Sequence, residues 1–453
     1  MIFLFLRPLL CLKSTGLHVL RTAAVMLIIA NGLTFAAKAH SYAVITLDQA
    51  IKKTLTNNPQ LHEFYYREQV LVGESKTAKL TPGYSVDAEV ENFLGTGDLS
   101  GIQEAEFSLS LSSVIELGDK IHARSQYIGA KQQQLSVEKQ LLSLDVLAEV
   151  TRRYIDVLAQ QETLKVLIEA QQLAEDALQA VTKRVSAGAS PLFEQRRAQA
   201  ALAEATLNTT TAKQQLHTHI KSLAIMWGEQ QPSFNKVEGN LFLLKESPKF
   251  SELTDRLDNS PYLQLFAEQS RLQAAELRIA QAANKPNISW SAGIRHINGM
   301  DETALVAGVS IPLLSQSRNA GAYESQRART EQIEQQKQAS LRSLYHQLNQ
   351  TLDVRNRALL EVASFQQGII PPLKEALSLV EKAYSNGRFS YLEWVTTRQE
   401  LVEAQYALIA AAKQAHQRAA DLEALTGISI TSVPSSAQNP NTDIAAPIFS
   451  ENR

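Results

Sequence analysis

Residues 84–94 read YSVDAEVENFL, and this stretch decides the fold. Every second side chain along most of it is apolar, and those that share the apolar side are Val86, Ala88 and Val90. A period of two predicts a β-strand with one apolar face and one wet face. Residues 102–111 alternate in the same way after a loop that contains several glycines. The sequence therefore predicts a β-hairpin over residues 84–111.

A second stretch, residues 287–312, repeats this pattern. Its alternating apolar side chains are Ile288, Trp290, Ala292 and Ile294, and a loop near Asn298-Gly299 separates its two strands. The two hairpins give four strands of about ten residues, the length that crosses an outer membrane when tilted. Four strands cannot close a barrel and lipid does not tolerate open sheet edges, so several copies must share one barrel. A soluble sandwich with one solvated face would show the same alternation.

Acidic side chains gather on the polar side of the first hairpin. They are Asp87, Glu89, Glu91, Glu104 and Glu106. By alternation we expect all five to face the barrel lumen, where rings of carboxylates favour cations. The alternative is that these polar side chains only keep the pore wet.

The chain consists of two similar halves. Asn57-Asn58-Pro59 recurs as Asn259-Ser260-Pro261, and Gly188 recurs as Gly387, in the same order along the chain. An ordered series of such matches indicates an internal duplication. We therefore expect a first repeat at 40–228, an equatorial insert at 229–250 and a second repeat at 251–428.

Each half is predicted to hold helices of matched length. Apolar spacings of three and four predict helices over 48–79, 120–186 and 190–226 in the first half, and over 251–283, 318–385 and 390–425 in the second. The two shorter helices of a half together match the long one, so we expect them to stack end to end beside it in a rod of about 100 Å. This spacing is typical of coiled coils, so a periplasmic structural coiled-coil protein is an alternative.

Two glycines and a proline pair are expected to shape these helices. Gly188 and Gly387 are predicted to form tight turns at the periplasmic tips, because glycine accepts the positive φ that ends a helix. Pro371-Pro372 is expected to kink the second long helix, since a proline inside a helix removes a hydrogen bond.

The two ends of the chain have their own composition. Residues 1–39 combine basic residues, a short apolar run and Ala37-Lys38-Ala39, which predicts a signal peptide. Residues 429–453 are rich in Ser, Pro and Asn and are expected to form a flexible tail. The only cysteine, Cys11, lies in the predicted signal peptide, so no disulfide is expected. A net charge of −2 argues against a nucleic-acid partner.

Several short motifs resemble those of a known family. They are Leu47-Asp48-Gln49-Ala50, the strand-to-helix junction Leu117-Gly118-Asp119-Lys120 and the turn Tyr384-Ser385-Asn386-Gly387. Their order resembles that of the TolC-like outer-membrane efflux proteins, and the junction looks most like the branch that serves heavy-metal cation pumps. The resemblance implies a homotrimer whose four strands per protomer make a trimeric 12-stranded β-barrel, continuing into a long α-helical coiled-coil barrel.

The resemblance also implies partners and site residues. The partners are a periplasmic adaptor (membrane fusion) protein and an inner-membrane pump of the resistance-nodulation-division type. The implied adaptor contacts at the tips are Val185, Gly188, Ser190, Tyr384, Gly387 and Ser390, and the implied gate residues are Glu194, Tyr384 and Glu393. No second acid follows on the next turn after either glutamate, which departs from the family pattern.

No catalytic constellation, cofactor motif or metal-ligand cluster stands out. His217 and His219 point to different faces of a predicted helix. The sequence therefore predicts a mainly α protein with a transmembrane β-barrel, located in the outer membrane of a Gram-negative cell and extending into the periplasm. We expect a passive duct, not an enzyme, that exports small solutes, heavy-metal cations among them. The alternative within transport is an outer-membrane conduit for type I protein secretion.

Overall fold

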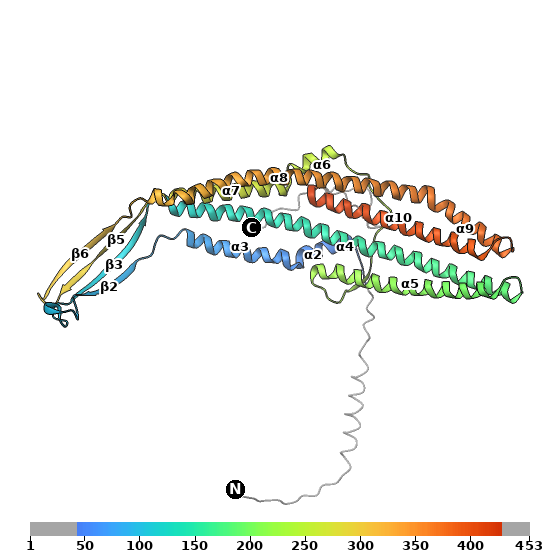
Figure 1. Cartoon of the computed structure of the whole chain (residues 1–453), viewed down its shortest axis with the longest axis horizontal. Coiled ribbons are helices and arrows are strands. Elements are labelled where there is room, and N and C mark those ends of the chain that lie inside the picture. Colours follow the sequence, from blue (N-terminus) through green and yellow to red (C-terminus); the bar gives the residue numbers. More distant parts are fainter. Residues whose placement is uncertain (1–42, 428–453) are drawn as a thin grey trace, which may run out of the picture. The chain divides into compact units, whose positions relative to one another are not determined.

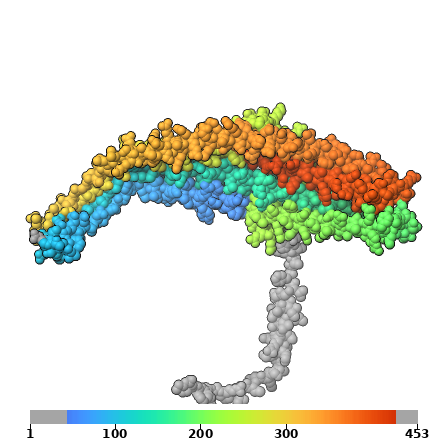
Figure 2. All heavy atoms as spheres, viewed as in Figure 1, coloured from blue at the N-terminus to red at the C-terminus, as the bar shows by residue number. Residues whose placement is uncertain are grey.

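The computed structural model describes residues 43–427, and the predictions for 1–39 and 429–453 lie outside that range. The chain divides into a short unit, Met1–Ala43, and a large unit, Val44–Arg453. The large unit holds the helices and the four-stranded sheet that follow (Figure 1), and Figure 2 draws the same residues as spheres with the same colours along the sequence. The predicted mainly α fold is confirmed, and the four predicted strands form one sheet.

Four antiparallel strands in the order β2-β3-β5-β6 come equally from the two halves. Their bounds are β2 Ser85–Glu91, β3 Glu106–Glu116, β5 Asn287–Ile297 and β6 Glu302–Ser310. The pairing of β3 with β5 joins the two hairpins, with Glu106 opposite Ile297 and Glu116 opposite Asn287. Strands β2 and β6 therefore form the outer edges of the sheet, each with one side unpaired within the chain.

From residue 43 onward, the first half contains four helices and two 3-10 turns. The helices are α2 Leu47–Asn57, α3 Pro59–Ala78, α4 Lys120–Ser186 and α5 Leu192–Ala224, and the turns are Gly97–Leu99 and Ile225–Trp227. The prediction of one helix over 48–79 is wrong, because the backbone is extended at Asn58 (φ −69°, ψ 123°). The Asn58 side chain accepts a hydrogen bond from the N–H of Gln60. Pro59 suits the first helical position, so the sequence itself encodes the restart.

As far as residue 427, the second half contains five helices and a π-helical turn. The helices are α6 Phe250–Leu257, α7 Pro261–Ala282, α8 Ser315–Ser364, α9 Ile370–Ser385 and α10 Tyr391–Thr426. The predicted single helix over 251–283 is wrong, because the backbone is extended at Ser260, just before Pro261 (φ −73°, ψ 156°). The helix predicted over 318–385 is divided by the π turn Phe365–Ile369. Pro371 and Pro372 have no N–H to donate, and the wider turn before them accommodates this loss.

The long helix α4 packs against α2 and α3 over one part of its length and against α5 over another (Figure 1). Helix α10 packs against α4, α8 and α9, while α7 packs against α4 and α8. Shorter helices thus lie end to end beside a longer one in both halves. Helices α3 and α5 form one lateral edge of this layer, and α8 and α9 form the other.

The main hydrophobic core lies where α4, α5 and α10 meet the insert. Val150, Tyr154 and Leu158 of α4 are at most 1% exposed. The Tyr154 hydroxyl donates to the carbonyl of Glu238 at 2.5 Å, which fastens the insert to α4. The insert contains β4, Phe234–Val237, which pairs with β1, Ala43–Ile45. Within residues 43–427, no helix is both long and apolar enough to cross a membrane.

Candidate functional site

One face of the four-stranded sheet is apolar across all four strands. The strand register places the side chains of Val86, Ala88, Val90, Phe107, Leu109, Leu111, Trp290, Ala292, Ile294, Leu305, Ala307 and Val309 on this face. Val86 and Val309 are each 72% exposed and Leu305 is 88% exposed. Large exposed apolar surfaces are rare on soluble proteins and mark a surface that meets lipid or another protein.

The opposite face is mainly polar, although Val114, Ile297, Ala304 and Val306 also lie on it. The register places Asp87, Glu89, Glu91, Glu106, Ser108, Ser110, Ser112, Ser291 and Arg295 on it. Asp87 lies opposite Ser110 and accepts a hydrogen bond of 2.7 Å from the hydroxyl of Ser112. Four of the five acids expected on this face therefore lie there.

Glu104 is the exception, and its predicted place on a strand is wrong. Strand β3 begins at Glu106, and Glu104 lies in the preceding hairpin loop. Its carboxylate lies so close to Gly299 that any Cβ there would clash with it. Asn298 also donates to the carbonyl of Ile102 at 3.0 Å, so the two hairpin loops pack together. The apolar–polar alternation continues into the loop, which is why the sequence pattern predicted Glu104 to lie on a strand.

Arg295 brings a positive charge into the acidic side of the polar face. Its Nη1 donates to Glu106 at 2.8 Å, its Nη2 lies 2.8 Å from Glu91, and its Nε donates to the Ser108 hydroxyl at 2.9 Å. Alternation predicts the face on which Arg295 lies, but its partners depend on a strand pairing between residues far apart in sequence. The cluster of Arg295 with Glu91, Glu106 and Ser108 therefore could not be predicted from the sequence pattern.

The two tips lie at the α4–α5 turn and the α9–α10 turn. Gly188 and Gly387 have left-handed φ values of 71° and 73°, as required for the reversal. The guanidinium of Arg184 lies 4.7 Å from the centre of the Tyr384 ring and donates to the carbonyl of the same residue. Its Nε donates to the Ser190 hydroxyl at 3.1 Å, so one arginine links both turns.

The three residues expected to form the gate differ in their contacts and in their exposure. The Tyr384 hydroxyl donates to Glu194 at 3.2 Å, and burial raises the pKa of Tyr384, which keeps this donor protonated. Trp394 packs on the same ring at 5.2 Å between centroids. Glu393 is exposed, and its N–H is capped by the hydroxyl of Ser390. The structure thus joins Tyr384 to Glu194 and leaves Glu393 apart from them.

The expected adaptor contacts are not equally accessible. Gly188, Gly387 and Ser390 are exposed, and Val185 and Ser190 are half-buried. Tyr384 is only 1% exposed, so its side chain does not offer a surface to a partner as predicted. Its ring is held inside the tip by Arg184 and Trp394, which the sequence pattern did not reveal.

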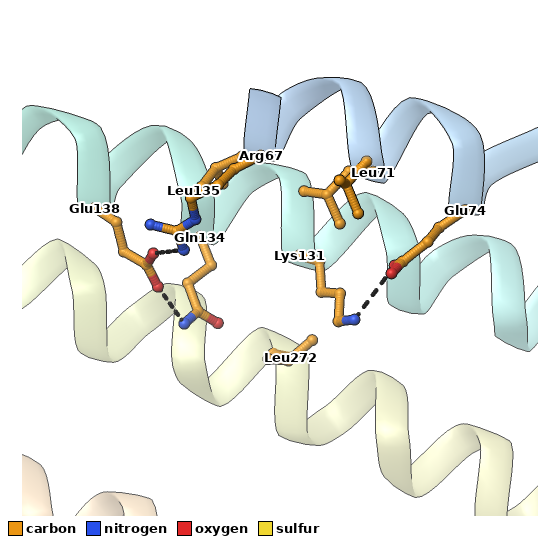
Figure 3. Close-up of a pocket in the computed structure, with 9 residues that line it drawn as sticks. Arg67, Leu71, Glu74, Lys131, Gln134, Leu135, Glu138 and Leu272 are labelled. Atoms are coloured by element: carbon orange, nitrogen blue, oxygen red, sulfur yellow. Dashed lines mark hydrogen bonds and ion pairs between the residues drawn. The ribbon is translucent and has the colours of Figure 1, made fainter. Parts of the chain in front are cut away.

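A groove of about 320 Å³ lies between α3, α4 and α7 (Figure 3). Leu71, Leu135 and Leu272 contribute apolar surface to its lining. Its charged side chains pair with one another, Arg67 with Glu138 at 2.5 Å and Lys131 with Glu74 at 3.3 Å. The ion pairs leave this groove without an uncompensated charge to attract a ligand.

A buried arginine anchors the insert to the second long helix. Arg355 is 1% exposed, and its Nη2 donates to the carbonyl of Lys245 at 2.7 Å while its Nη1 donates to Ser247. His416 of α10 lies 2.9 Å from the carbonyl of Leu241 through its Nε2. Residues 43–427 contain no group of three or more His, Cys, Asp or Glu side chains that could hold a metal ion.

The sheet and the helical layer together define a class, a subunit of an outer-membrane channel. Residues 51–229 and 253–428 match the family described as "Outer membrane efflux protein", and the chain belongs to this family. The two matched stretches correspond to the two halves of the fold. The resemblance seen in the sequence is therefore confirmed, as are the efflux-channel function and the outer-membrane location.

Among curated proteins, the chain is similar to the cobalt-zinc-cadmium resistance protein CzcC of Cupriavidus metallidurans. The two are 24% identical over 316 residues, which cover 69% of this chain and 75% of CzcC. This similarity supports the resemblance to the heavy-metal branch.

Solved structures share the fold. A membrane protein from Pseudomonas aeruginosa superimposes with a TM-score of 0.71 at 15% identity, covering 84% of this chain and 92% of the other. CusC gives a TM-score of 0.69 at 16% identity, with 85% and 92% covered. The Campylobacter jejuni CmeC outer membrane channel gives 0.69 at 16% identity, with 84% and 85% covered.

Proposed function

We propose that three copies of this chain form an outer-membrane duct that exports heavy-metal cations and other small solutes. In this proposal a periplasmic adaptor connects the duct to an inner-membrane pump of the resistance-nodulation-division type. The four strands of each copy contribute to a 12-stranded barrel, and the helical layers continue it as a tunnel through the periplasm. The duct is passive and needs no catalytic group.

The observation that carries this proposal is the sheet with an exposed apolar face and two open edges. In lipid an unpaired edge leaves backbone N–H and C=O groups unsatisfied, at a cost of several kcal/mol each. Pairing β2 of one copy with β6 of the next removes every edge, and it places all apolar faces outward and all polar faces inward. Three copies make a barrel with an even strand number, as single-chain bacterial barrels also have.

The lateral edges of the helical layer support the same arrangement. Tyr65, Tyr66 and Val70 on α3 are between 59% and 68% exposed, and Leu360 on α8 and Leu379 on α9 are 69% and 60% exposed. These side chains lie on elements that form opposite edges of one copy. Joining copies side by side would cover both edges, as coiled-coil packing requires.

The proposed cargo rests on two observations. The relative CzcC is described as a cobalt-zinc-cadmium resistance protein. The polar face of the sheet carries more carboxylates than cations, and a lumen of this charge favours cations. Residues 1–39 serve as the signal peptide in this proposal, 40–228 and 251–428 as the two repeats, and 229–250 as an equatorial belt.

The tips are proposed to serve as both docking site and gate. The exposed turns at Gly188, Gly387 and Ser390 are accessible to an adaptor. The hydrogen bond between Tyr384 and Glu194 joins the two turns. In this proposal it keeps the tip closed. The adaptor or pump would then need to break this link to open the duct.

The experiment that tests the proposal is a deletion strain challenged with cobalt, zinc and cadmium salts, and separately with detergents and antibiotics. We expect lower tolerance to the metal salts, restored by the intact gene. Unheated gel electrophoresis of the outer-membrane fraction should show a trimer that heating converts to a monomer. A strain with unchanged metal tolerance and a missing secreted protein would instead indicate type I secretion. A chain found only in the soluble periplasmic fraction would contradict the proposal.

A further inference from the structure

We propose that Arg295 sets the ion preference of the barrel lumen by neutralising part of its acidic ring. The inference rests on the proposed function, because it requires the polar face of the sheet to line a pore. It concerns the cluster of Arg295, Glu91, Glu106 and Ser108, which spans strands β5, β2 and β3.

The cluster lies at the loop end of the sheet. Glu91 is the last residue of β2, Glu106 is the first of β3, and Arg295 stands two residues before the end of β5. Figure 1 shows that this end of the strands lies away from the helices. In the proposed duct it is therefore the outer mouth, the last part of the lumen that cargo passes.

The two carboxylates of the cluster oppose each other in the sheet. Glu91 pairs directly with Glu106 in the antiparallel register. Like charges at directly opposed positions destabilise a pair of strands, so the sheet requires a compensating cation nearby. Arg295 lies on the adjacent strand, diagonal to Glu106, and reaches both carboxylates.

The guanidinium is held in place rather than free to move. Each of its three nitrogens has an acceptor at 2.8 or 2.9 Å. A planar guanidinium with parallel donors fits carboxylates better than a lysine ammonium does. Arg295 therefore places a fixed positive charge at one level of the lumen.

Arg295 can affect ion preference because it is a single cation among several carboxylates on the polar face of the sheet. It is the only Lys or Arg in the four strands of the sheet, whereas the polar face carries six acids, Asp87, Glu89, Glu91, Glu106, Glu116 and Glu302. With Arg295 the cluster has a net charge of −1, and without it −2. In a trimer this difference is repeated three times around one ring, and ions in a narrow pore respond strongly to such rings.

The test measures the ratio of potassium to chloride permeability of the full-length trimer in planar bilayers under a KCl gradient. Arg295→Gln is expected to raise this ratio about twofold or more, because each protomer gains a net negative charge. The double variant Arg295→Gln with Glu91→Gln restores the net charge and should return to the wild-type ratio. Arg295→Lys keeps the charge and should also remain near wild type.

The double variant separates charge from architecture. If Arg295 only held the strands together, the double variant would remain as altered as Arg295→Gln. Arg295→Gln could fail to form the heat-sensitive trimer, and in that case Glu106→Gln is the variant to measure. It makes the net charge of the cluster more positive, so it should lower the ratio of potassium to chloride permeability. The inference is overturned if Arg295→Gln leaves the potassium-to-chloride permeability ratio unchanged. It is equally overturned if Arg295→Gln forms no trimer and Glu106→Gln leaves that ratio unchanged. Wild-type protein without trimers or conductance would contradict the proposed function instead.

Discussion

The hydroxyl of Tyr384 donates a hydrogen bond of 3.2 Å to the carboxylate of Glu194, and this bond joins the tip of the second half to the tip of the first. Arg184 adds a second link, because its guanidinium lies over the Tyr384 ring and its Nε binds Ser190. Tyr384 is the centre of this arrangement, with Trp394 on the same ring. The two halves are thus fastened at the place where the proposed gate must open.

Tyr384→Phe removes the hydroxyl and keeps the ring. We expect the closed tip to lose about 0.5–1.5 kcal/mol, the usual net value of one hydrogen bond. The single-channel recordings should then show more frequent or larger openings than wild type. Tyr391→Phe is the matched control, because Tyr391 lies in the same aromatic cluster, 6.2 Å from the Tyr384 ring. Equal conductance in wild type and Tyr384→Phe would show that this hydrogen bond does not contribute to gating.

Arg355→Ala deletes the buried anchor of the insert. The carbonyl of Lys245 and the hydroxyl of Ser247 would lose a charged donor, which we expect to cost about 3 kcal/mol or more. Limited proteolysis should then cut within 229–250 faster, and the trimer should dissociate at a lower temperature. Arg357→Ala alters an exposed arginine two residues away and should behave as wild type. If both variants resist protease equally, the insert does not depend on Arg355.

Tyr262 gives a prediction about alkaline pH. Burial, followed by the nearby carboxylate of Asp145, raises the pKa of Tyr262 to about 12. An unfolded tyrosine has a pKa of about 10, so the folded chain keeps a proton that the unfolded chain loses between these values. The resulting stability is fully present below pH 10 and is lost as the pH rises toward 12.

We therefore expect Tyr262→Phe to lose less thermal stability than wild type over this alkaline window. Other tyrosines titrate in both proteins, so only the difference between the two melting curves is informative. Parallel curves for Tyr262→Phe and wild type would show that this phenol does not titrate differently on unfolding.

The sequence predicted the faces of the strands well because a period of two is a local property. Val86 and Val90 share a face whatever strand lies beside them. Glu104 was misplaced because the alternation runs past the point where pairing stops, and only the partner strand shows that β3 begins at Glu106. The pairing of Arg295 with Glu91 and Glu106 depends on register between distant segments, which no local pattern contains.

The helices show the same division between local and distant information. Asn58 followed by Pro59 is a local start sequence, and the break in the predicted helix 48–79 could have been read from it. Pro371 and Pro372 predict a disruption of the helix expected over 318–385. That the disruption is a π turn depends on the backbone before the two prolines. The burial of Tyr384 depends on Arg184, which comes from the other half of the chain.

The central claim is that the apolar face of the sheet meets lipid in a shared barrel, and two neighbouring substitutions on β6 test it most directly. Leu305 lies on the apolar face and Val306 on the polar face of the same strand. A lysine on the lipid side of a barrel costs about 2–4 kcal/mol near the membrane midplane, whereas a lysine in the lumen remains in water.

The measurement is the amount of heat-sensitive trimer in the outer-membrane fraction. We predict that Leu305→Lys strongly reduces this trimer and that Val306→Lys leaves it close to the wild-type amount. Leu305 is 88% exposed in the single chain, so a soluble protein would tolerate the lysine there. Equal amounts of trimer from Leu305→Lys and wild type would contradict the membrane barrel.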